Sequence, residues 1–562
     1  MQNGNMQVKD LFNGDRIFNI PKYQRTYSWE KENLEDFLED LKNQRDLDTK
    51  YFLGTFLFHK KDDKSSYEYL DVVDGQQRLT TIIIFLKIIL TLLKEKESEF
   101  FNERIYRKYI YDGECYKIEL ENDDNSFLQK FILNDSKCQS HETNSQKKLY
   151  SSKEYFKKKL SIFSIEELEK MYTVLTEAKV IVYVVNEVSD ATQIFELLND
   201  RGKRLTSLEG IKSFLMYRIG CLKLNNKDHH IDIIQSDFSS IYRIIEEGSV
   251  NEDEVLRAHT IAFEECKSED YNSPEKFIKN KINMMFNLKE NDLKIKDEII
   301  SYVNRLHNSY ILYKKIKTNS IKSKSLDKLF MIGRVNPFIP LIMNIFDKES
   351  EERIERFIES ICRFTFRASL IGLRNDNEAF YGYIRKKEYF LDIFKKIVDE
   401  NWWNINARVD QFIRYQNYYE WINKNIIKYI LFSYENDLRI KKGYPLLTIE
   451  DYFSEDSRLK FSIEHITAQK SEKFKNENIK NEKFKEEYLH YIGNLVIDTV
   501  ASNSRKGNKN VDEKEKEFFE APLMSQNEIN TFDVNWNNLK NVQEFIDIRG
   551  KKIIEFIEEK LL

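Results

Sequence analysis

Proline and glycine, the residues that most often interrupt helices, are scarce in this chain. It holds 6 prolines and 16 glycines among 562 residues, whereas average usage predicts about 28 and about 39 in a chain of this length. So few interruptions predict long helices joined by few turns. One hydrophobic core cannot serve a chain this long, and we expect two to four domains. The predicted fold class is α+β and mostly helical.

Local patterns add a few strands to the first part of the chain. Apolar runs predict strands, and apolar positions recurring every three or four residues predict helices. The predicted strands are 15–21, 51–58, 69–73 and 179–185, and the predicted helices are 29–41, 79–94, 192–198 and 207–217. Polar stretches near 121–147 and 222–229 are interpreted as loops or insertions. From about 220 to 440 the pattern is helical and aromatic.

The most apolar segment is too short to cross a membrane. Ile82 to Leu93 is the longest candidate and contains Lys87, whereas a bilayer needs about 18 or more apolar residues. The first ten residues lack the basic start and apolar run of a secretory signal. With 33% charged residues and a mean hydropathy of -0.60, we expect a cytoplasmic protein with no membrane partner.

Cysteine content and net charge restrict the chemistry only in part. The five cysteines are scattered and form no Cys-x-x-Cys pair, so neither a disulfide framework nor a zinc clamp is indicated. The net charge of -5 neither favours nor excludes DNA. Binding follows local basic patches, and 89 Lys and Arg residues are enough to form one.

A short apolar strand near the C-terminus carries an acidic residue beside a histidine, Glu464 and His465. A carboxylate can hold a divalent cation while an imidazole activates water, and this pairing suits phosphodiester cleavage. Asn494 and Asn503 follow 29 and 38 residues after the histidine, the second at the predicted start of a helix. This order is the layout of the strand–strand–helix HNH nuclease finger. It predicts a DNA-cutting site held by hydrophobic packing rather than zinc.

The segment after Asn503 is cationic, with Arg505, Lys506 and Lys509 suited to phosphate. The structural alternative is that each polar group is solvated or satisfied in the core, which is the commoner outcome for any one of them alone. Because the combination is more specific than its parts, we favour a nuclease site.

A second candidate site follows the predicted strand 69–73. There Asp74, Gly75, two glutamines and Arg78 lead directly into an apolar helix. The helix start offers N–H donors to an anion, Arg78 can pair with phosphate, and Asp74 can hold a metal or water. A capped helix with Arg78 in a structural ion pair explains these residues equally well. No Gly-x-x-x-x-Gly-Lys-Ser/Thr motif occurs, which excludes a P-loop.

Two other polar clusters of the N-terminal region allow the same two interpretations. One is Gln24-Arg25, between two tyrosines. The other is the loop 199–207, which begins Asn199-Asp200-Arg201 and holds three cations within four residues. Such a loop before a helix either grips phosphate or simply connects two helices.

Both ends of the sequence resemble the GmrSD-like family of type IV, modification-dependent restriction endonucleases. The resemblance rests on 21–25, 52–54, 73–81 and 195–202 in the N-terminal region and on 463–466, 492–495 and 503–506 in the C-terminal region. It covers about 1–220 and 440–562 in the family's order. The middle matches only in its helical character.

The resemblance implies three domains and a nucleotide site. They are a ParB-like α/β nucleotide-binding or sensor domain at 1–220, a helical linker domain at 221–440, and a helical nuclease domain at 441–562 that carries a ββα-metal (HNH) finger. The pocket for a nucleoside triphosphate, which the domain would bind or hydrolyse, would be formed by Gln24, Arg25, Asp74, Gln77 and Arg78, with Asn199, Asp200 and Arg201 nearby.

For the finger, the resemblance implies that His465 is the general base, that Glu464 and Asn503 bind one Mg2+ or Mn2+, and that Asn494 braces the fold. We also expect Lys506, one helical turn beyond Asn503, to steady the phosphate. The sequence departs from the family at 467–469, Thr-Ala-Gln, where a proline often precedes the glutamine. The departure concerns the geometry of the loop, not the chemistry.

Together these features predict a nucleotide-regulated, metal-dependent endonuclease that defends against phage or other foreign DNA, which is expected to be modified. One finger cuts one strand, so we expect nicking, or double-strand cutting by a homodimer. The alternative is a sensor that binds nucleotide and DNA through a finger that does not cleave.

Overall fold

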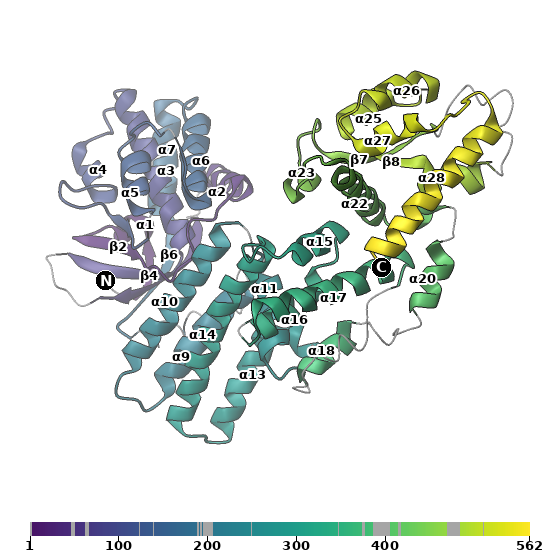
Figure 1. Ribbon diagram of the computed structural model, residues 1–562. Helices are drawn as coiled ribbons and strands as arrows, with labels where there is room; N and C mark the ends of the chain where they lie inside the picture. Colours follow the sequence, from purple (N-terminus) through teal and green to yellow (C-terminus); the bar gives the residue numbers. More distant parts are fainter. Residues whose placement is uncertain are drawn as a thin grey trace. The chain divides into compact units, whose positions relative to one another are not determined.

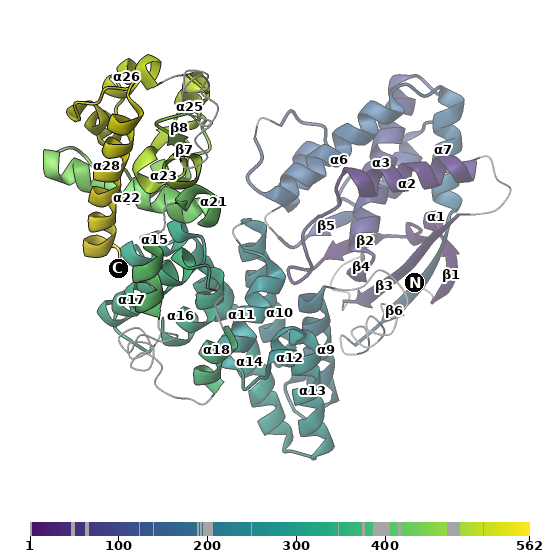
Figure 2. The same ribbon diagram turned by 90° about the vertical axis from the view of Figure 1, so that its right-hand side faces the viewer.

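The computed structural model (Figures 1 and 2) describes residues 3–45, 51–61, 67–122, 124–138, 140–187, 190, 194, 206–248, 250–346, 348–373, 377–385, 405–413, 417–468, 484–509 and 511–562. The chain divides into two compact units, Met1–Thr318 and Asn319–Leu562. Each unit has its own sheet, and each is described separately below.

The N-terminal unit is built on a mixed six-stranded sheet. Its strands are β1 (Gly4–Gln7), β2 (Arg16–Ile20), β3 (Phe52–Lys60), β4 (Glu68–Asp74), β5 (Ile118–Leu120) and β6 (Lys179–Val185). Their order across the sheet is β1-β6-β3-β4-β2-β5. β2 runs parallel to β4 and β5, and β3 runs parallel to β6, whereas the β3–β4 and β1–β6 pairs are antiparallel. The interior strand β4 ends where α3 begins.

A layer of helices packs against this sheet. The helices are α1 (Val8–Leu11), α2 (Lys31–Arg45), α3 (Gln76–Glu95), α4 (Glu103–Tyr109), α5 (Asn125–Phe127), η1 (Leu128–Leu133), α6 (Asn144–Leu160) and α7 (Ile165–Glu177). α3 is buried along most of its length and packs against α6 and α7 (Figure 1). Strand and helix side chains join in one continuous buried cluster, which is the core of this layer.

A helical bundle completes the N-terminal unit. It consists of α9 (Ser207–Cys221), α10 (Lys227–Glu246), α11 (Glu252–Phe263), α12 (Ser268–Tyr271), α13 (Pro274–Asn287) and α14 (Asp292–Lys317). α10 packs along α14, and α9 packs against α10 and α13. Thr206 begins α9 with a capping box, in which its side chain and that of Glu209 each bond the other's backbone N–H.

The C-terminal unit is helical around a two-stranded sheet. Its elements are α15 (Lys324–Ile332), η2 (Asn336–Phe338), α16 (Ile339–Phe346), α17 (Glu351–Leu370), α18 (Asn377–Arg385), α20 (Ile405–Ile413), α21 (Tyr418–Trp421), α22 (Lys424–Lys442), α23 (Ile449–Phe453), β7 (Phe461–His465), η4 (Lys485–Leu489), η5 (Ile492–Asn494), β8 (Leu495–Thr499), α25 (Val500–Lys506), α26 (Val511–Phe519), α27 (Met524–Asn527), η6 (Glu528–Thr531) and α28 (Leu539–Lys560). α22 packs on both strands, and α28 packs on η5.

The mostly helical α+β class is confirmed, and the four predicted strands of the N-terminal region are β2, β3, β4 and β6. The predicted helices 29–41, 79–94 and 207–217 are α2, α3 and α9, and the helix 192–198 falls largely outside the described residues. The interpretation of 121–147 as a loop is wrong in part. This stretch contains α5 and η1 and the start of α6, because Phe127, Leu128 and Leu133 are buried in the core.

The boundary between the two units falls at 318/319, inside the stretch predicted as one helical domain at 221–440. The helices α10 to α14 of that stretch belong to the N-terminal unit, and α15 to α22 belong to the C-terminal unit. The predicted division into 1–220, 221–440 and 441–562 therefore describes motif-bearing regions, and its functional meaning stays a prediction.

Among the described helices, α3 alone is long and apolar enough to cross a membrane by length and composition. Within its most apolar window 78% of the residues are buried inside the fold. Burial of this kind is typical of the core helix of a soluble protein. A cytoplasmic location stays a prediction.

Candidate active site

β7 and β8 form an antiparallel pair, and α25 begins at the residue after β8. The register pairs Phe461 with Thr499 and His465 with Leu495. Thr499 caps α25, since its side chain accepts a hydrogen bond from the N–H of Ser502. We call this strand–strand–helix arrangement the ββα unit. Glu464 and His465 lie at the end of its first strand.

Asn494 connects the segment that leaves β7 to the segment that enters β8. Its side-chain oxygen accepts a hydrogen bond from the N–H of Thr467 at 2.9 Å, and its side-chain nitrogen donates to the carbonyl of Leu489 at 2.8 Å. Its own carbonyl accepts from the N–H of Ile466 at 2.9 Å. Asn494 is fully buried. These bonds fix the chain just beyond His465, where the family's proline is missing.

The turn η5 that contains Asn494 rests on α28. Arg549 is fully buried and donates from Nη1 to the carbonyls of Gly493 at 2.8 Å and Leu495 at 2.7 Å. A Cβ on Gly493 would lie 2.0 Å from the carbonyl oxygen of Ile546. Only glycine permits this approach, so α28 determines the position of the turn.

His465 is buried among aromatic and cationic neighbours. The ring of Tyr419 meets it edge-on with centroids 4.6 Å apart, and its Nε2 lies 3.1 Å from Nδ1 of His490. Burial, with His490, Lys424 and Lys514 nearby, lowers the pKa of His465 to about 3. The imidazole is therefore neutral at pH 7, which is the form that accepts a proton.

His490 also belongs to this site, although its position was not predicted from the sequence. Its Nε2 lies 3.5 Å from Oε1 of Glu420 on α21, and its ring stacks on Tyr419 at 5.6 Å between centroids. Burial lowers the pKa of His490. The available signal was a histidine four positions before Asn494, but no periodicity distinguishes it from a solvated residue.

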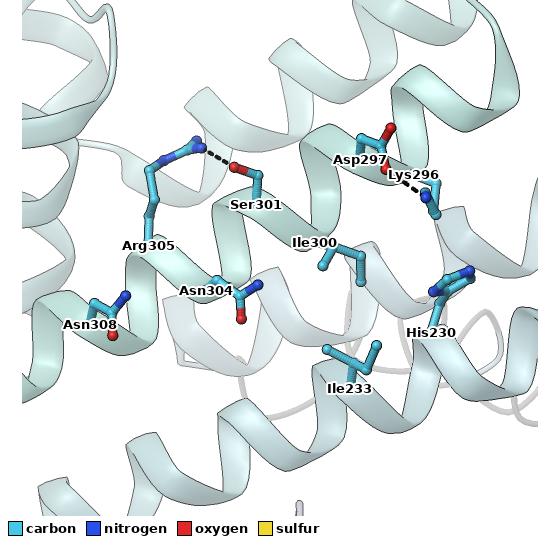
Figure 3. A pocket seen from close by; sticks show the side chains of 9 residues that line it. All are labelled: His230, Ile233, Lys296, Asp297, Ile300, Ser301, Asn304, Arg305 and Asn308. Carbon is cyan, nitrogen blue, oxygen red and sulfur yellow. Dashed lines mark hydrogen bonds and ion pairs between the residues drawn. The ribbon is translucent and has the colours of Figure 1, made fainter.

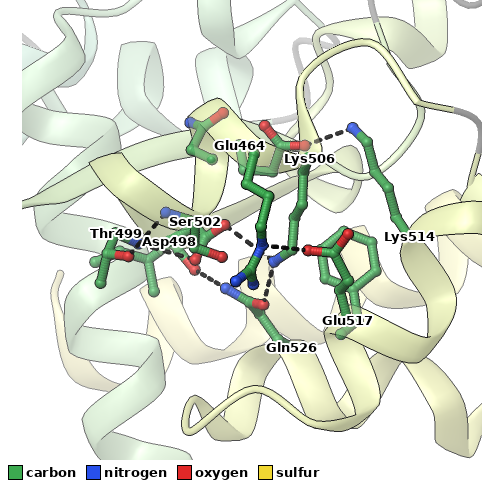
Figure 4. A network of polar contacts seen from close by, with 12 residues as sticks. Glu464, Asp498, Thr499, Ser502, Lys506, Lys514, Glu517 and Gln526 are labelled. Atoms are coloured by element: carbon green, nitrogen blue, oxygen red, sulfur yellow. Dashed lines mark hydrogen bonds and ion pairs between the residues drawn. The ribbon is translucent and has the colours of Figure 1, made fainter. Parts of the chain in front are cut away.

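Glu464 faces the side of β7 opposite to His465, because neighbours on a strand alternate. Its Oε1 lies 2.5 Å from Nζ of Lys514 on α26, with the two side chains 6% and 1% exposed (Figure 4). Lys514 also donates to the carbonyl of His465 at 3.3 Å. Burial raises the pKa of Glu464, and Lys514 opposes that rise. The predicted metal ligand thus has a cationic partner inside the protein.

Asn503 lies on α25 and points back to β7. Its side-chain nitrogen donates to Oγ of Ser462 at 3.0 Å and to the carbonyl of Ile463 at 3.1 Å. Both bonds use the nitrogen, so the amide oxygen is the atom that remains for a metal. Within the described part of the chain, no group of three or more His, Cys, Asp or Glu side chains is gathered as a metal site. A metal here would rely on amide, phosphate or water oxygens as well as Glu464.

Lys506 departs from its predicted position at the phosphate. Its ammonium is fully buried and donates to Oδ2 of Asp498 at 3.0 Å and Oε1 of Gln526 at 2.7 Å (Figure 4). It also lies 4.3 Å from the ring centroid of Phe518. The Lys506 ammonium thereby contacts side chains from β8, α26 and α27. It has a structural role in this geometry.

In the N-terminal unit, Asp74 and Arg78 stand at the turn from β4 into α3. Gly75 adopts a φ of 92°, where glycine is favoured, and a Cβ there would lie 2.4 Å from the ring of Phe56. The positive φ and the close approach to Phe56 are two independent reasons why the turn requires glycine at position 75. Burial raises the pKa of Asp74 beside it, and Arg78 opposes that rise.

Arg78 is held by backbone oxygens of β3. Its Nη1 donates to the carbonyls of Leu53 at 2.7 Å and Thr55 at 3.3 Å, and its guanidinium lies 5.5 Å from the ring centroid of Phe56. A Cβ on Gly54 would lie 2.3 Å from Nη1. The Arg78 side chain thus connects the two segments 52–54 and 73–81, which the resemblance to the family singled out.

Gln77 and Gln24 fasten the loop after β2 to the start of α3. Gln77 accepts from the N–H of Ser28 at 2.8 Å and donates to the carbonyl of Thr26 at 2.9 Å. Gln24 donates to the carbonyl of Val73 at 3.0 Å. Four predicted pocket residues, Gln24, Asp74, Gln77 and Arg78, are thus gathered at the carboxyl end of β4.

A polar cavity of about 450 Å³ opens beside this cluster. Lys22, Gln24 and Thr26 line it from the loop after β2, and Tyr242, Arg243 and Glu246 line it from α10. Arg25 does not line this cavity; it lines a smaller one with Gln76 and Gln77, and it lies 3.5 Å from the Glu209 carboxylate. The predicted neighbours Asn199, Asp200 and Arg201 lie outside the described residues.

Another cavity, of about 390 Å³, lies between α10 and α14 (Figure 3). Lys296 is paired with Asp297 at 2.5 Å, and Arg305 donates to Oγ of Ser301 at 2.7 Å. Its cations already have partners, and it contains none of the predicted site residues. We assign it no function.

Comparison with protein families identifies the chain as one of the restriction endonuclease class. The GmrSD restriction endonuclease N-terminal domain matches residues 8–216, and the GmrSD restriction endonuclease C-terminal domain matches residues 403–555. The chain belongs to the GmrSD family of type IV restriction endonucleases, and its substrate is DNA. Comparison with curated proteins found no matching relative. The C-terminal match begins well before 441 and includes α21, which carries Tyr419 and Glu420.

Proposed function

We propose that the chain is a metal-dependent endonuclease of the HNH type, with His465 as its general base. The observation that carries this proposal is a buried imidazole that directly follows a carboxylate in sequence, at the end of the first strand of a ββα unit. A base must be neutral to take a proton from water. Because the chain belongs to a restriction endonuclease family, DNA is the substrate on which such a base would act.

The donor atoms at the ββα unit fit a hard divalent cation. Glu464 offers a carboxylate, and Asn503 offers the amide oxygen that its two hydrogen bonds leave unused. Mg2+ and Mn2+ take oxygen ligands and commonly retain water and phosphate oxygens as well. When bound, the cation supplies Lewis-acid stabilisation of charge at the phosphate, which is worth several kcal/mol. Lys514 is the present partner of Glu464, so a carboxylate oxygen would have to be shared between Lys514 and the cation when the cation binds.

Each of the chain's own residues has a defined task in this proposal. His465 takes a proton from the water that attacks the phosphorus. Asn494 holds the backbone on both sides of His465, through its bonds to Thr467 and Ile466. Lys506 holds β8, α26 and α27 together, and the exposed cations Arg505 and Lys509 lie on the surface near Glu517.

We infer that the N-terminal unit is a ParB-like sensor that binds a nucleoside triphosphate beside the start of α3. The cluster of Gln24, Asp74, Gln77 and Arg78 and the adjoining polar cavity support this inference. The same bonds also support the alternative that this segment is only a capped helix, because Arg78 and Gln77 already have hydrogen-bond partners within the protein. Isothermal titration with each nucleoside triphosphate decides between them: Arg78→Lys should lose binding that the exposed-site control Arg104→Lys retains.

The substrate is proposed to be modified phage DNA in the cytoplasm. One ββα unit carries one cutting centre, so a single chain should nick, and a double-strand cut requires a homodimer. Supercoiled plasmid separates these outcomes, since nicked and linear products migrate differently. We expect nicking with Mg2+ or Mn2+ and none with EDTA. Glu464→Gln and Asn503→Ala should raise the metal concentration required for half-maximal rate.

A second candidate function is a sensor that binds nucleotide and DNA without cutting. The pairing of Glu464 with Lys514 favours it, because the carboxylate is already neutralised inside the protein. In that case the intact protein would shift DNA in a gel yet leave plasmid supercoiled at every metal concentration. Nicking that is lost with EDTA would exclude it.

A further inference from the structure

Three side chains from separate parts of the C-terminal unit form a chain of contacts that ends on the proposed base. The carboxylate of Glu420 lies 3.5 Å from Nε2 of His490, and Nδ1 of His490 lies 3.1 Å from Nε2 of His465. Tyr419 stacks on His490 and meets His465 edge-on. The first residue lies on α21, the second follows η4, and the third ends β7.

The contacts have a direction, because a carboxylate can only accept. With its negative charge 3.5 Å from Nε2 of His490, Glu420 favours a proton on that nitrogen, which leaves a lone pair on Nδ1 of the same ring. That lone pair in turn requires the proton of His465 to stand on Nε2. The lone pair of His465 then lies on Nδ1, and Nδ1 is the atom that can receive a proton from water. Each step follows from the tautomer of the ring before it.

We propose that His490 is a positioning residue for His465, and that Glu420 fixes the tautomer of both imidazoles through it. This inference rests on the proposed role of His465 as general base. His490 itself touches neither DNA nor metal in this account. It acts only by orienting the His465 ring and by keeping the accepting lone pair on Nδ1.

Neighbouring groups support this arrangement. Asn417, the N-cap of α21, donates from its side chain to Oε2 of Glu420 at 2.8 Å and so holds the carboxylate in place. The N–H of Tyr419 donates to the carbonyl of His490 at 3.1 Å. The aromatic ring and the backbone bond join α21 to the segment before Asn494. A histidine that merely filled space would need neither the carboxylate nor the second ring.

Two amide substitutions of His490 form a matched pair for the test. The side-chain nitrogen or oxygen of asparagine can stand where Nδ1 of His490 stands, whereas that of glutamine stands nearer to Nε2. His490→Asn can therefore keep the bond to His465, and His490→Gln and His490→Phe cannot. Glu420→Gln keeps the size of the side chain, but it can donate as well as accept and so no longer fixes the tautomer.

The experiment measures plasmid nicking by the full-length chain with Mn2+ and separates kcat from KM. His490→Phe and His490→Gln should lower kcat about 10- to 100-fold with KM unchanged, less than the ~100- to 10,000-fold that a whole general base contributes. His490→Asn should recover most of that loss, and Glu420→Gln should show a smaller loss. Equal losses in all three His490 variants, or a loss confined to KM, would overturn the positioning role.

A second measurement keeps this outcome distinct from failure of the proposed function. In protein labelled with 15N at histidine, the protonated and lone-pair nitrogens of a neutral ring give well-separated signals in solid-state NMR, and His465→Asn identifies the His465 pair. His490→Phe should change which nitrogen of His465 carries the proton, or mix the two tautomers. An unchanged tautomer overturns the inference whether or not the protein cuts DNA. Nicking by His465→Ala would overturn the base itself.

Discussion

The carboxylate of Glu464 and the ammonium of Lys514 lie 2.5 Å apart, both nearly excluded from solvent. Removing one member of a buried ion pair leaves an uncompensated charge, which typically costs about 3–5 kcal/mol. Lys514→Met should therefore destabilise the C-terminal unit by about that amount, measured by urea unfolding in EDTA. Addition of Mn2+ should restore part of the loss. Lys509→Met, at a surface pair, is the control and should change stability by less than about 1 kcal/mol.

The contact of Gly493 with α28 predicts a second loss of stability. Alanine there would place a Cβ 2.0 Å from the carbonyl oxygen of Ile546, and a backbone atom cannot move aside as a side-chain tip can. Gly493→Ala should cost about 1–3 kcal/mol through overpacking. Calorimetry of this variant against Ser504→Ala, at an exposed residue of α25, tests it. An unfolding temperature equal to wild type would show that η5 does not depend on this approach.

Asn494 should affect both stability and cutting. Asn494→Ala removes a donor and an acceptor, leaving the buried N–H of Thr467 and the carbonyl of Leu489 unsatisfied, at about 1–3 kcal/mol each. Asn494→Asp keeps the acceptor for Thr467, but it loses the donor to Leu489 and places a carboxylate at a fully buried position, so it should be less stable than alanine. The unfolding free energies and the nicking rates should both fall in the order wild type, alanine, aspartate. An alanine variant as stable as wild type would show that these bonds do not stabilise the unit.

His259 gives the N-terminal unit a defined response to pH. It is fully buried, and burial lowers its pKa to about 4 from 6.5. As pH falls below 6.5 the unfolded chain binds a proton that the folded chain refuses, so acid favours unfolding. Between pH 6.5 and 4.5 this residue should remove up to about 1.4 kcal/mol of stability per pH unit.

Urea unfolding of His259→Asn across that range tests the prediction. The variant is less stable throughout, but its stability should depend less steeply on pH. His229→Asn, on the exposed side of α10, should keep the wild-type slope. Parallel slopes for all three proteins would mean that other groups dominate acid unfolding.

Sequence reasoning located the strands around both motifs because their apolar runs are local and continuous. The spacing of Asn494 and Asn503 from His465 also predicted the order strand, strand, helix, in which both asparagines contact the segment around β7. Sequence reasoning failed where distant segments supply the neighbour. Nothing in the local pattern places Glu420 and His490 beside His465, or Lys514 on Glu464.

Lys506 shows how burial changes the expected contact. A lysine next to Arg505 in a cationic segment suggests contact with phosphate, yet the structure directs Lys506 inward to Asp498 and Gln526. Arg78 is similar, because its partners are backbone carbonyls of β3 that no residue pattern identifies. The sequence shows that a side chain is charged, but the fold determines whether that side chain is buried and which groups it contacts.

The most direct test of the central claim is the nicking rate of His465→Ala with Mn2+ on supercoiled plasmid, compared with wild type and with His229→Ala. His465 contacts His490 and Tyr419, so circular dichroism and the unfolding temperature are used to verify that the variant keeps its fold. We predict that nicking falls at least ~100-fold, the smaller end of a general base's contribution, while His229→Ala cuts like wild type. A correctly folded His465→Ala protein that cuts at more than a few per cent of the wild-type rate would contradict the assignment.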